Sequence, residues 1–174
     1  MMILLTGGSG CGKSFYAESL CMKLPKPRYY IAAMRPFGEE SERKIARHRK
    51  MRDGKGFETV ERYTALSSLE LPGRGTALLE CICNLTANEM FDEEGSYDDP
   101  FDRVISGVEA LCLQCNDLIV VTNDVGSDGH IYDEGTNAYI SALGKINAEL
   151  AKRADAVYEL VCGIPVVRKG ALLE

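Results

Sequence analysis

Short apolar runs alternate along this chain with segments that have the periodicity of amphipathic helices. The apolar or β-rich runs predict strands at residues 2–6, 28–33, 57–61, 76–80, 117–122 and 156–161, and a tail strand at 164–168 that pairs back. Helical patterns lie between them, at residues 13–22, 39–51, 85–90, 101–115 and 136–153. This alternation predicts an α/β fold with a mainly parallel central sheet covered by helices on both faces.

Length and composition add limits to this picture. The 174 residues suit one domain, and neither a Pro/Gly/Ser linker nor an internal repeat divides them, so we expect residues 1–174 to form a single domain. The seven cysteines are an odd number within apolar segments, which favours reduced thiols and a cytoplasmic protein. No apolar run is long enough to cross a bilayer, so we expect no membrane insertion.

Charge is unevenly distributed along the chain. The net charge of −6 argues against a general nucleic-acid binder. Basic residues are concentrated between Arg43 and Lys55, which predicts either a local anion site or a solvated helix face. Acidic residues are concentrated between Glu89 and Asp102, which predicts a surface loop.

A complete phosphate-binding loop, G-G-S-G-C-G-K-S, follows the first predicted strand directly. Gly7 and Gly12 allow successive backbone N–H groups to converge on phosphate oxygens. Lys13 can reach the terminal phosphates, and Ser14 offers a hydroxyl to Mg²⁺. The sequence therefore predicts a P-loop NTPase fold of the RecA-like kind. Its triphosphate site comprises Gly7, Gly8, Ser9, Gly10, Cys11, Gly12, Lys13 and Ser14.

Ligands of such folds bind at the carboxyl ends of the parallel strands. The predicted topology brings five segments to that rim: the phosphate loop, Ala32-Ala33-Met34, Glu61, Glu80 and Asn123-Asp124. Glu80 is the last residue of its predicted strand. Its carboxylate is a hard oxygen ligand that can bind Mg²⁺ directly or through water. Two other interpretations stay open, a contact with a ribose hydroxyl and a strand-end acid that meets only solvent.

His48 is one of only two histidines and lies among Arg47, Arg49, Lys50 and Arg52. Surrounding cations lower the pKa of an imidazole and keep its neutral, nucleophilic form available, and they also stabilise a phosphate charge that develops during attack. Considered alone, these residues favour an exposed helical histidine over a nucleophile. His130 lies in a predicted loop and receives no role.

Several segments together resemble one family. They are M-M-I-L-L-T-G-G at the start, K-I-A-R-H-R-K-M-R around His48, L-L-E-C at Glu80, V-V-T-N-D-V-G after residue 119, and V-C-G-I-P-V-V-R-K near the end. In this order they are similar to the bifunctional adenosylcobinamide kinase/adenosylcobinamide-phosphate guanylyltransferase of cobalamin biosynthesis, the CobU family. The element around His48 is the specific one, because a P-loop alone fits many families.

The resemblance implies two reactions at one nucleotide site. ATP or GTP, with Mg²⁺, would phosphorylate adenosylcobinamide, and GTP would then give its GMP to adenosylcobinamide phosphate through a guanylyl intermediate on His48. Lys13 would act in the transfer. Nucleotide contacts would also fall on Ala32, Ala33, Met34, Arg49, Lys50, Met51, Arg52, Glu61 and Glu80. The family also implies a homotrimer.

The chain departs from the family pattern in places. Lys44 and Asp124 stand where arginine and glutamate are usual, and residues 137–141 lack two arginines and an aspartate. Two alternatives remain open, the first of them because of the missing arginines. One is a small-molecule P-loop kinase without guanylyltransferase activity, and the other is a GTP-sensing module without turnover.

Overall fold

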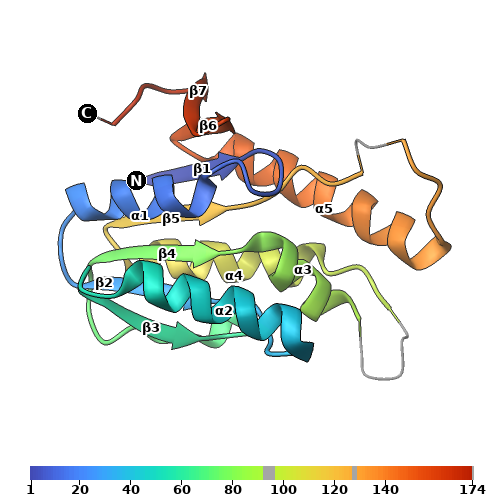
Figure 1. The fold of residues 1–174 in the computed structure, drawn as a ribbon, viewed down its shortest axis with the longest axis horizontal. Coiled ribbons are helices and arrows are strands. Elements are labelled where there is room, and N and C mark those ends of the chain that lie inside the picture. The colour runs from blue at the N-terminus through green and yellow to red at the C-terminus, as the bar shows by residue number, and fades with distance from the viewer. Residues whose placement is uncertain (92–96, 127–128, 174) are drawn as a thin grey trace.

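The computed structural model describes residues 1–91, 97–126 and 129–173. Within them lies a seven-stranded sheet in the order β3-β2-β4-β5-β1-β6-β7 (Figure 1). The strands are β1 (Met2–Thr6), β2 (Arg28–Ala32), β3 (Phe57–Glu61), β4 (Thr76–Glu80), β5 (Asp117–Val121), β6 (Ala156–Val161) and β7 (Ile164–Lys169). Only the β6–β7 pair is antiparallel among these strands, which confirms the mainly parallel sheet and the tail strand that pairs back.

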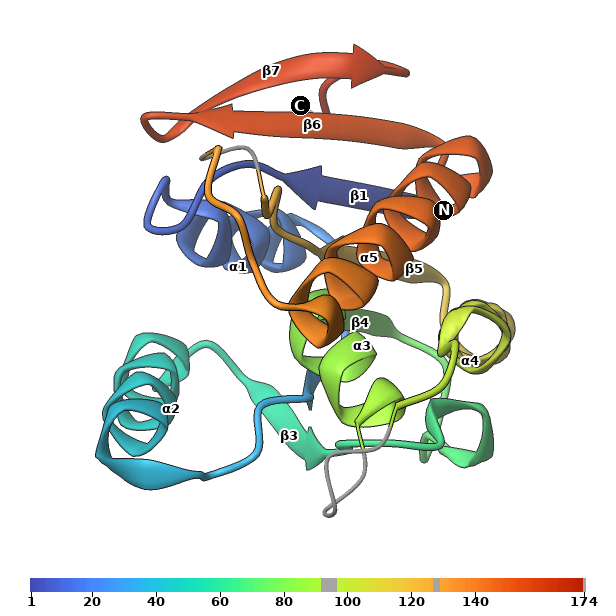
Figure 2. The ribbon, with the colours of Figure 1, turned by 90° about the vertical axis from the view of Figure 1, so that its right-hand side faces the viewer.

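Helices cover both faces of the sheet. They are α1 (Lys13–Lys23), α2 (Gly38–Arg52), α3 (Ile82–Met90), α4 (Phe101–Gln114) and α5 (Glu134–Arg153), with a 3₁₀ turn η1 (Leu66–Ser68). Figure 2 shows α1 and α2 on one side of the sheet and α4 on the other. The helices α3, α4 and α5 pack against one another, and α1 packs over β4 and β5. The strands β1, β2, β4, β5 and β6 are mostly buried, which explains their largely apolar sequences, whereas the edge strands β3 and β7 are more exposed.

Two helices begin two or more residues earlier than the periodicity predicts. The helix α5 begins at Glu134 because the side chain of Asp133 caps it, accepting a hydrogen bond from the Thr136 N–H. The helix α3 begins at Ile82, directly after β4, and the Leu85 N–H donates to the Cys81 carbonyl at 3.1 Å. This early start of α3 places its first turn beside the carboxyl end of β4.

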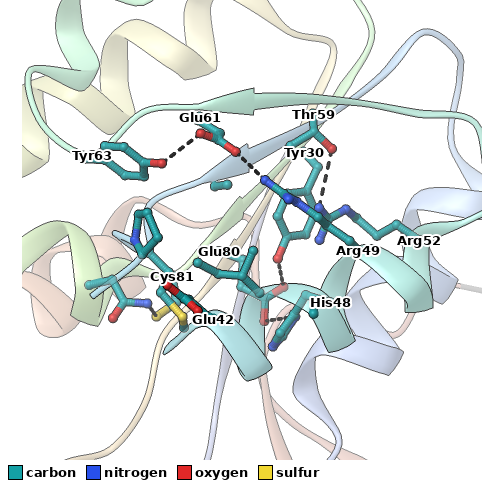
Figure 3. Close-up of a pocket in the computed structure, with 16 residues that line it drawn as sticks. Tyr30, Glu42, His48, Arg49, Arg52, Thr59, Glu61, Tyr63, Glu80 and Cys81 are labelled. Carbon is teal, nitrogen blue, oxygen red and sulfur yellow. Dashed lines mark hydrogen bonds and ion pairs between the residues drawn. The ribbon is translucent and has the colours of Figure 1, made fainter. Parts of the chain in front are cut away.

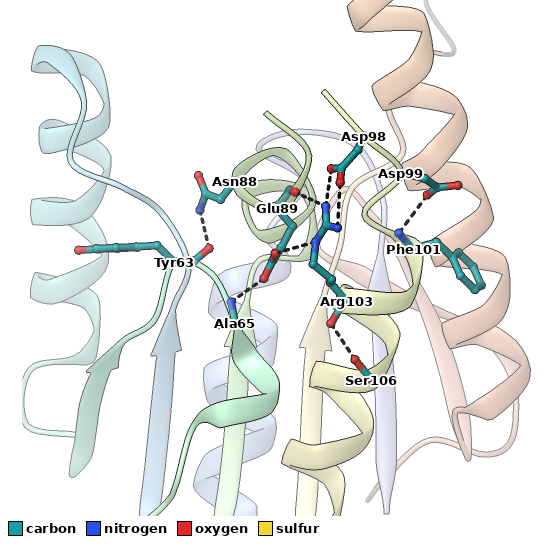
Figure 4. A network of polar contacts seen from close by, with 9 residues as sticks. All are labelled: Tyr63, Ala65, Asn88, Glu89, Asp98, Asp99, Phe101, Arg103 and Ser106. Atoms are coloured by element: carbon teal, nitrogen blue, oxygen red, sulfur yellow. Dashed lines mark hydrogen bonds and ion pairs between the residues drawn. The ribbon is translucent and has the colours of Figure 1, made fainter. Parts of the chain in front are cut away.

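The prediction that the acidic stretch forms a surface loop is wrong at both ends. Glu89 belongs to α3 and Asp102 to α4. Arg103 connects the two helices by donating to the Glu89 carboxylate at 3.1 Å and to Asp98 at 2.6 Å (Figure 4). Arg103 therefore neutralises two of the acidic residues in this stretch. Residues 92–96, which include Asp92, Glu93 and Glu94, lie outside the described residues.

The helices also bear on membrane topology. Across the described ranges, no helix combines the length and the apolar character that a membrane span requires.

Candidate active site

The phosphate loop runs from the end of β1 into α1. Gly7 and Gly12 have positive φ values of 136° and 98°, which confirms that the turn needs glycine at these positions. Lys13 is only 6% exposed, and its ammonium donates to the carbonyls of Gly7 and Gly8 at 2.8 and 2.7 Å. The loop therefore curls around a positive charge at the start of α1, where the backbone N–H groups of a helix also favour an anion.

Glu80 connects this loop to the neighbouring strands. Its Oε1 accepts a hydrogen bond from the Ser14 hydroxyl, and its Oε2 accepts one from the Tyr30 hydroxyl at 2.7 Å. Burial alone would raise the pKa of Glu80, but contacts with His48, Ser14 and Tyr30 outweigh it and lower that pKa. The same carboxylate raises the pKa of Tyr30, in addition to the larger effect of burial. The Glu80 side chain is therefore a buried, ionised carboxylate rather than an acid that merely meets solvent.

His48 lies against this carboxylate. Its side chain is 13% exposed, and its Nδ1 is 3.5 Å from Glu80 Oε1. The interpretation of His48 as an exposed helical residue is therefore wrong. The sequence placed only cations around His48, but the Glu80 carboxylate also lies within ion-pair distance of its imidazole. With Nδ1 facing Glu80, Nε2 is the ring nitrogen on the opposite side of this contact.

The basic residues of α2 have separate partners. Arg49 donates to Glu61 at 2.8 Å, and Tyr63 donates to the other oxygen of Glu61 at the same distance. These two bonds, Tyr63 first, lower the pKa of Glu61. Arg52 is buried, with its guanidinium carbon 3.5 Å from the centre of the Tyr30 ring. Its Nη1 is buried and has no hydrogen-bond partner among the described residues, so it can serve an oxygen of a ligand.

These side chains surround a cavity of about 460 Å³, here called the inner pocket (Figure 3). It lies between α2 and the carboxyl ends of β2, β3 and β4. Its lining includes Tyr30, Ala32, Met34, His48, Arg49, Arg52, Thr59, Glu61, Tyr63, Glu80, Cys81 and Asn84. The size and the few convergent polar groups are typical of a small-molecule site.

The inner pocket meets the phosphate loop through one carboxylate, because Glu80 contacts both His48 and Ser14. A family model described as cobinamide kinase / cobinamide phosphate guanyltransferase matches residues 3–167. The chain belongs to this family. The match covers both the phosphate loop and the inner pocket, and confirms the resemblance seen in the sequence.

Two relatives support this membership in the cobinamide kinase family over nearly the full length. The bifunctional adenosylcobalamin biosynthesis protein CobU of Escherichia coli (strain K12) is 32% identical over 180 residues, covering 95% of this chain and 98% of the relative. The protein of the same name from Salmonella typhimurium is 31% identical over the same shares of both chains. Both alignments therefore cover nearly the whole of this chain and of each relative.

The solved structures support the fold of this cobinamide kinase family member. An ATPase from a type III secretion system of pathogenic bacteria has a TM-score of 0.56 at 12% sequence identity. That match covers 97% of this chain and 57% of the ATPase. This likeness supports the P-loop NTPase fold, and it says nothing about substrate.

Outside the phosphate loop, the structure brings six of the nine expected nucleotide-binding residues into the inner pocket. Ala32, Met34, Arg49, Arg52, Glu61 and Glu80 line it. Ala33 does not, because it is fully buried and its carbonyl accepts a hydrogen bond from Asn88. Lys50 is exposed and Met51 half-buried, and both lie outside the lining.

Sequence reasoning missed Tyr30, Thr59 and Asn84. A signal existed for two of them, because side chains two residues apart on a strand share a face. Tyr30 therefore shares a face of β2 with Ala32, and Thr59 shares a face of β3 with Glu61. Asn84 had no such signal, since it depends on the early start of α3.

Gly7→Ala is expected to lower the free energy of unfolding by about 1–3 kcal/mol. A Cβ at Gly7 would lie 2.6 Å from the Leu160 carbonyl, at a φ of 136° that side chains rarely tolerate. Gly8→Ala is the matched control, because a Cβ there meets nothing within 4 Å. Urea unfolding of both variants measures the difference, and equal losses would contradict the assigned close approach.

Glu80→Gln is expected to destabilise the protein by about 1–3 kcal/mol at neutral pH, because three polar neighbours lose a charged partner. A carboxyl whose folded pKa is lowered adds stability above its unfolded pKa of about 4.3 and loses it as the pH falls through the folded value. The difference between wild type and variant should therefore shrink in acid. Urea unfolding across pH measures it, with exposed Glu58→Gln as the control, and a pH-independent difference would contradict the lowered pKa.

Proposed function

We propose that this protein phosphorylates adenosylcobinamide and then transfers GMP from GTP to adenosylcobinamide phosphate, through a guanylyl intermediate on His48. One observation carries the proposal. His48 Nδ1 and the Ser14 hydroxyl both contact Oε1 of Glu80, so the nucleophile and the phosphate loop belong to one centre. Membership in the cobinamide kinase family and two relatives named as bifunctional adenosylcobalamin biosynthesis proteins support the same activity.

The kinase step uses the phosphate loop. The terminal phosphoryl group of ATP or GTP passes to a hydroxyl of adenosylcobinamide, which loses its proton as the new P–O bond forms and the nucleoside diphosphate leaves. Lys13 and the loop N–H groups stabilise the charge on the transferring group. The ammonium is already inside the loop, so little rearrangement is needed to orient it.

The site also suits Mg²⁺. Ser14 Oγ and Glu80 Oε1 are in direct contact, so a hydroxyl and an ionised carboxylate, both hard oxygen donors, face the same point next to the phosphate loop. We propose that these two residues hold the ion, directly or through water. Bound there, Mg²⁺ would neutralise charge on the phosphates.

The guanylyl step uses His48. Nε2 attacks the α-phosphorus of GTP, the bond to the β-phosphate oxygen breaks, and pyrophosphate leaves. His48 Nδ1 lies 3.5 Å from Glu80 Oε1 and has no hydrogen-bond partner among the described residues. In the proposed step the two groups move into hydrogen-bond distance, so that the carboxylate accepts the Nδ1 hydrogen, leaves the Nε2 lone pair free and stabilises the imidazolium. A phosphate oxygen of adenosylcobinamide phosphate then attacks the same phosphorus, the P–N bond breaks, and adenosylcobinamide-GDP forms.

The inner pocket is proposed to hold the nucleoside part of GTP. Its volume of about 460 Å³ is in the range of small-molecule sites. The unpartnered Nη1 of Arg52 and the fixed carboxylate of Glu61 provide one donor and one acceptor within it. These groups can recognise a base or ribose, while the α-phosphate lies towards His48.

Three broader features form part of the proposal, of which the oligomeric state rests on the family resemblance and the other two on cysteine usage and charge. We propose that the protein is cytoplasmic, that it forms a homotrimer, and that nucleic acid is not a partner. The exposed apolar side chains of the β6–β7 hairpin, among them Ile164 at 66% exposure, offer a surface for subunit contacts. Light scattering of the purified protein tests the trimer.

The activity is tested by product analysis. The protein is incubated with adenosylcobinamide, Mg²⁺ and GTP, and the corrinoids are separated by chromatography. We expect adenosylcobinamide phosphate first and adenosylcobinamide-GDP next, with one pyrophosphate released for each GMP transferred. Phosphorylation without the second product would identify a kinase that lacks guanylyltransferase activity, and GTP binding without either product would identify a sensing module.

A further inference from the structure

A second and larger cavity, here called the outer groove, opens beside the inner pocket. It has a volume of about 950 Å³ and lies between the start of α2 and the helix α3. The two cavities share Met34, Pro36, Tyr63 and Asn84 as lining residues. A molecule in the outer groove can therefore extend an arm into the inner pocket, where His48 lies.

Six of the twelve residues that line the outer groove are apolar or aromatic, and the others include the charged residues Arg35, Glu40 and Lys44. Phe37 is 89% exposed although it is a large apolar residue. Phe91, directly after α3, and Tyr63, from the segment after β3, contribute two more rings. Such a concentration of aromatic surface at a concave site is typical of a binding surface rather than of a solvated face.

The carboxamide side chains of Asn84 and Asn88 add polar groups to this wall. Asn88 donates through Nδ2 to the carbonyls of Ala33 and Tyr63, at 2.8 and 3.0 Å. These bonds fix the side chain, and Figure 4 shows its oxygen turned away from Tyr63. Asn84 donates to the Cys81 sulfur at 3.2 Å. The groove thus combines flat apolar surface with fixed carboxamides, a combination suited to a large apolar ring that carries amide groups.

Two other cavities do not communicate with the chemical centre. One is lined by Met1, Asp155 and neighbours at the amino end of the sheet, and another lies between α4 and α5. Neither shares a lining residue with the inner pocket. The outer groove, in contrast, joins it directly.

We propose that the outer groove binds the corrinoid ring of the acceptor, with Phe37 against a face of the ring. The arm that carries the hydroxyl or phosphate group passes between Met34 and Asn84 into the inner pocket. This inference rests on the proposed function, and it adds the location of the acceptor. Groove and inner pocket together then hold both substrates in one continuous space.

Phe37→Ala tests the acceptor site. Removing the ring is expected to raise the KM for adenosylcobinamide phosphate about tenfold, because the contact with an apolar ring face is lost. Formation of guanylyl-enzyme from GTP alone should be unchanged, since that half-reaction needs no acceptor. Phe37→Tyr keeps the ring and should keep the wild-type KM. The fold is expected to survive, because the Phe37 backbone makes the local bonds to Ser41.

Leu113→Ala is the matched control. Leu113 is 76% exposed and lies near the end of α4, outside the outer groove. This variant should leave every constant unchanged. An unchanged KM in Phe37→Ala, in a protein whose wild type makes adenosylcobinamide-GDP, would overturn the acceptor site and leave the proposed function intact. Failure of the wild type to form that product would instead overturn the proposed function.

Discussion

His48→Asn is expected to abolish GMP transfer while phosphorylation of adenosylcobinamide continues. Asparagine is smaller than histidine and polar, but it cannot form the phosphoramidate that the proposed route requires. Because removal of a nucleophile costs several orders of magnitude, we expect guanylyl transfer to fall by about 10³-fold or more. The kinase step should fall far less, since it depends on Lys13 and the loop N–H groups.

The measurement compares the two products in one reaction with GTP. His130→Asn is the matched control, because His130 is the other histidine of the chain and is exposed. It should retain both activities. Equal loss of both activities in a folded His48→Asn protein would contradict the division of roles, and retention of GMP transfer would exclude His48 as the GMP carrier.

Lys13→Met is expected to lower both activities, each by about 10³-fold. The ammonium is the charge enclosed by the phosphate loop, where it contacts the carbonyls of Gly7 and Gly8. Methionine retains most of the apolar stem and removes the charge. Because the terminal phosphates leave as pyrophosphate in the guanylyl step, the same charge stabilises the departing group in both reactions.

Initial rates of both steps test this, together with thermal unfolding to verify the fold. Lys23→Met is the matched control at the far end of α1, where the lysine is exposed. It should leave both rates near wild type. If Lys13→Met lost only the kinase activity, the phosphate loop would not serve the cleavage at the α-phosphate.

Most of the fold could be predicted from local pattern. The bounds of β1, β4 and β6 agree with the predicted strands because buried strands have short apolar sequences between turn signals. The bounds of β3 agree as well, although this strand is more exposed. The start of α5 was harder to predict from the sequence, because it depends on the Asp133 cap. The phosphate loop was predictable because its chemistry requires glycines at fixed positions.

The surroundings of His48 could not be predicted in the same way. Its sequence neighbours are cations, but their partners come from elsewhere in the fold: Arg49 pairs with Glu61 and Arg52 packs on Tyr30. The residue that meets the imidazole, Glu80, ends a different strand. Local charge alone therefore favoured an exposed histidine and missed its main electrostatic partner, because that contact is tertiary.

The central claim is that one site cleaves a triphosphate at two positions and that His48 carries the GMP. The direct test is to incubate the protein with α-labelled GTP, digest it, and identify the labelled peptide by mass spectrometry. We expect one acid-labile, hydroxide-stable label on His48, which adenosylcobinamide phosphate removes as labelled adenosylcobinamide-GDP. A label on another residue would contradict the account. Formation of labelled adenosylcobinamide-GDP without label ever appearing on His48 would contradict it too.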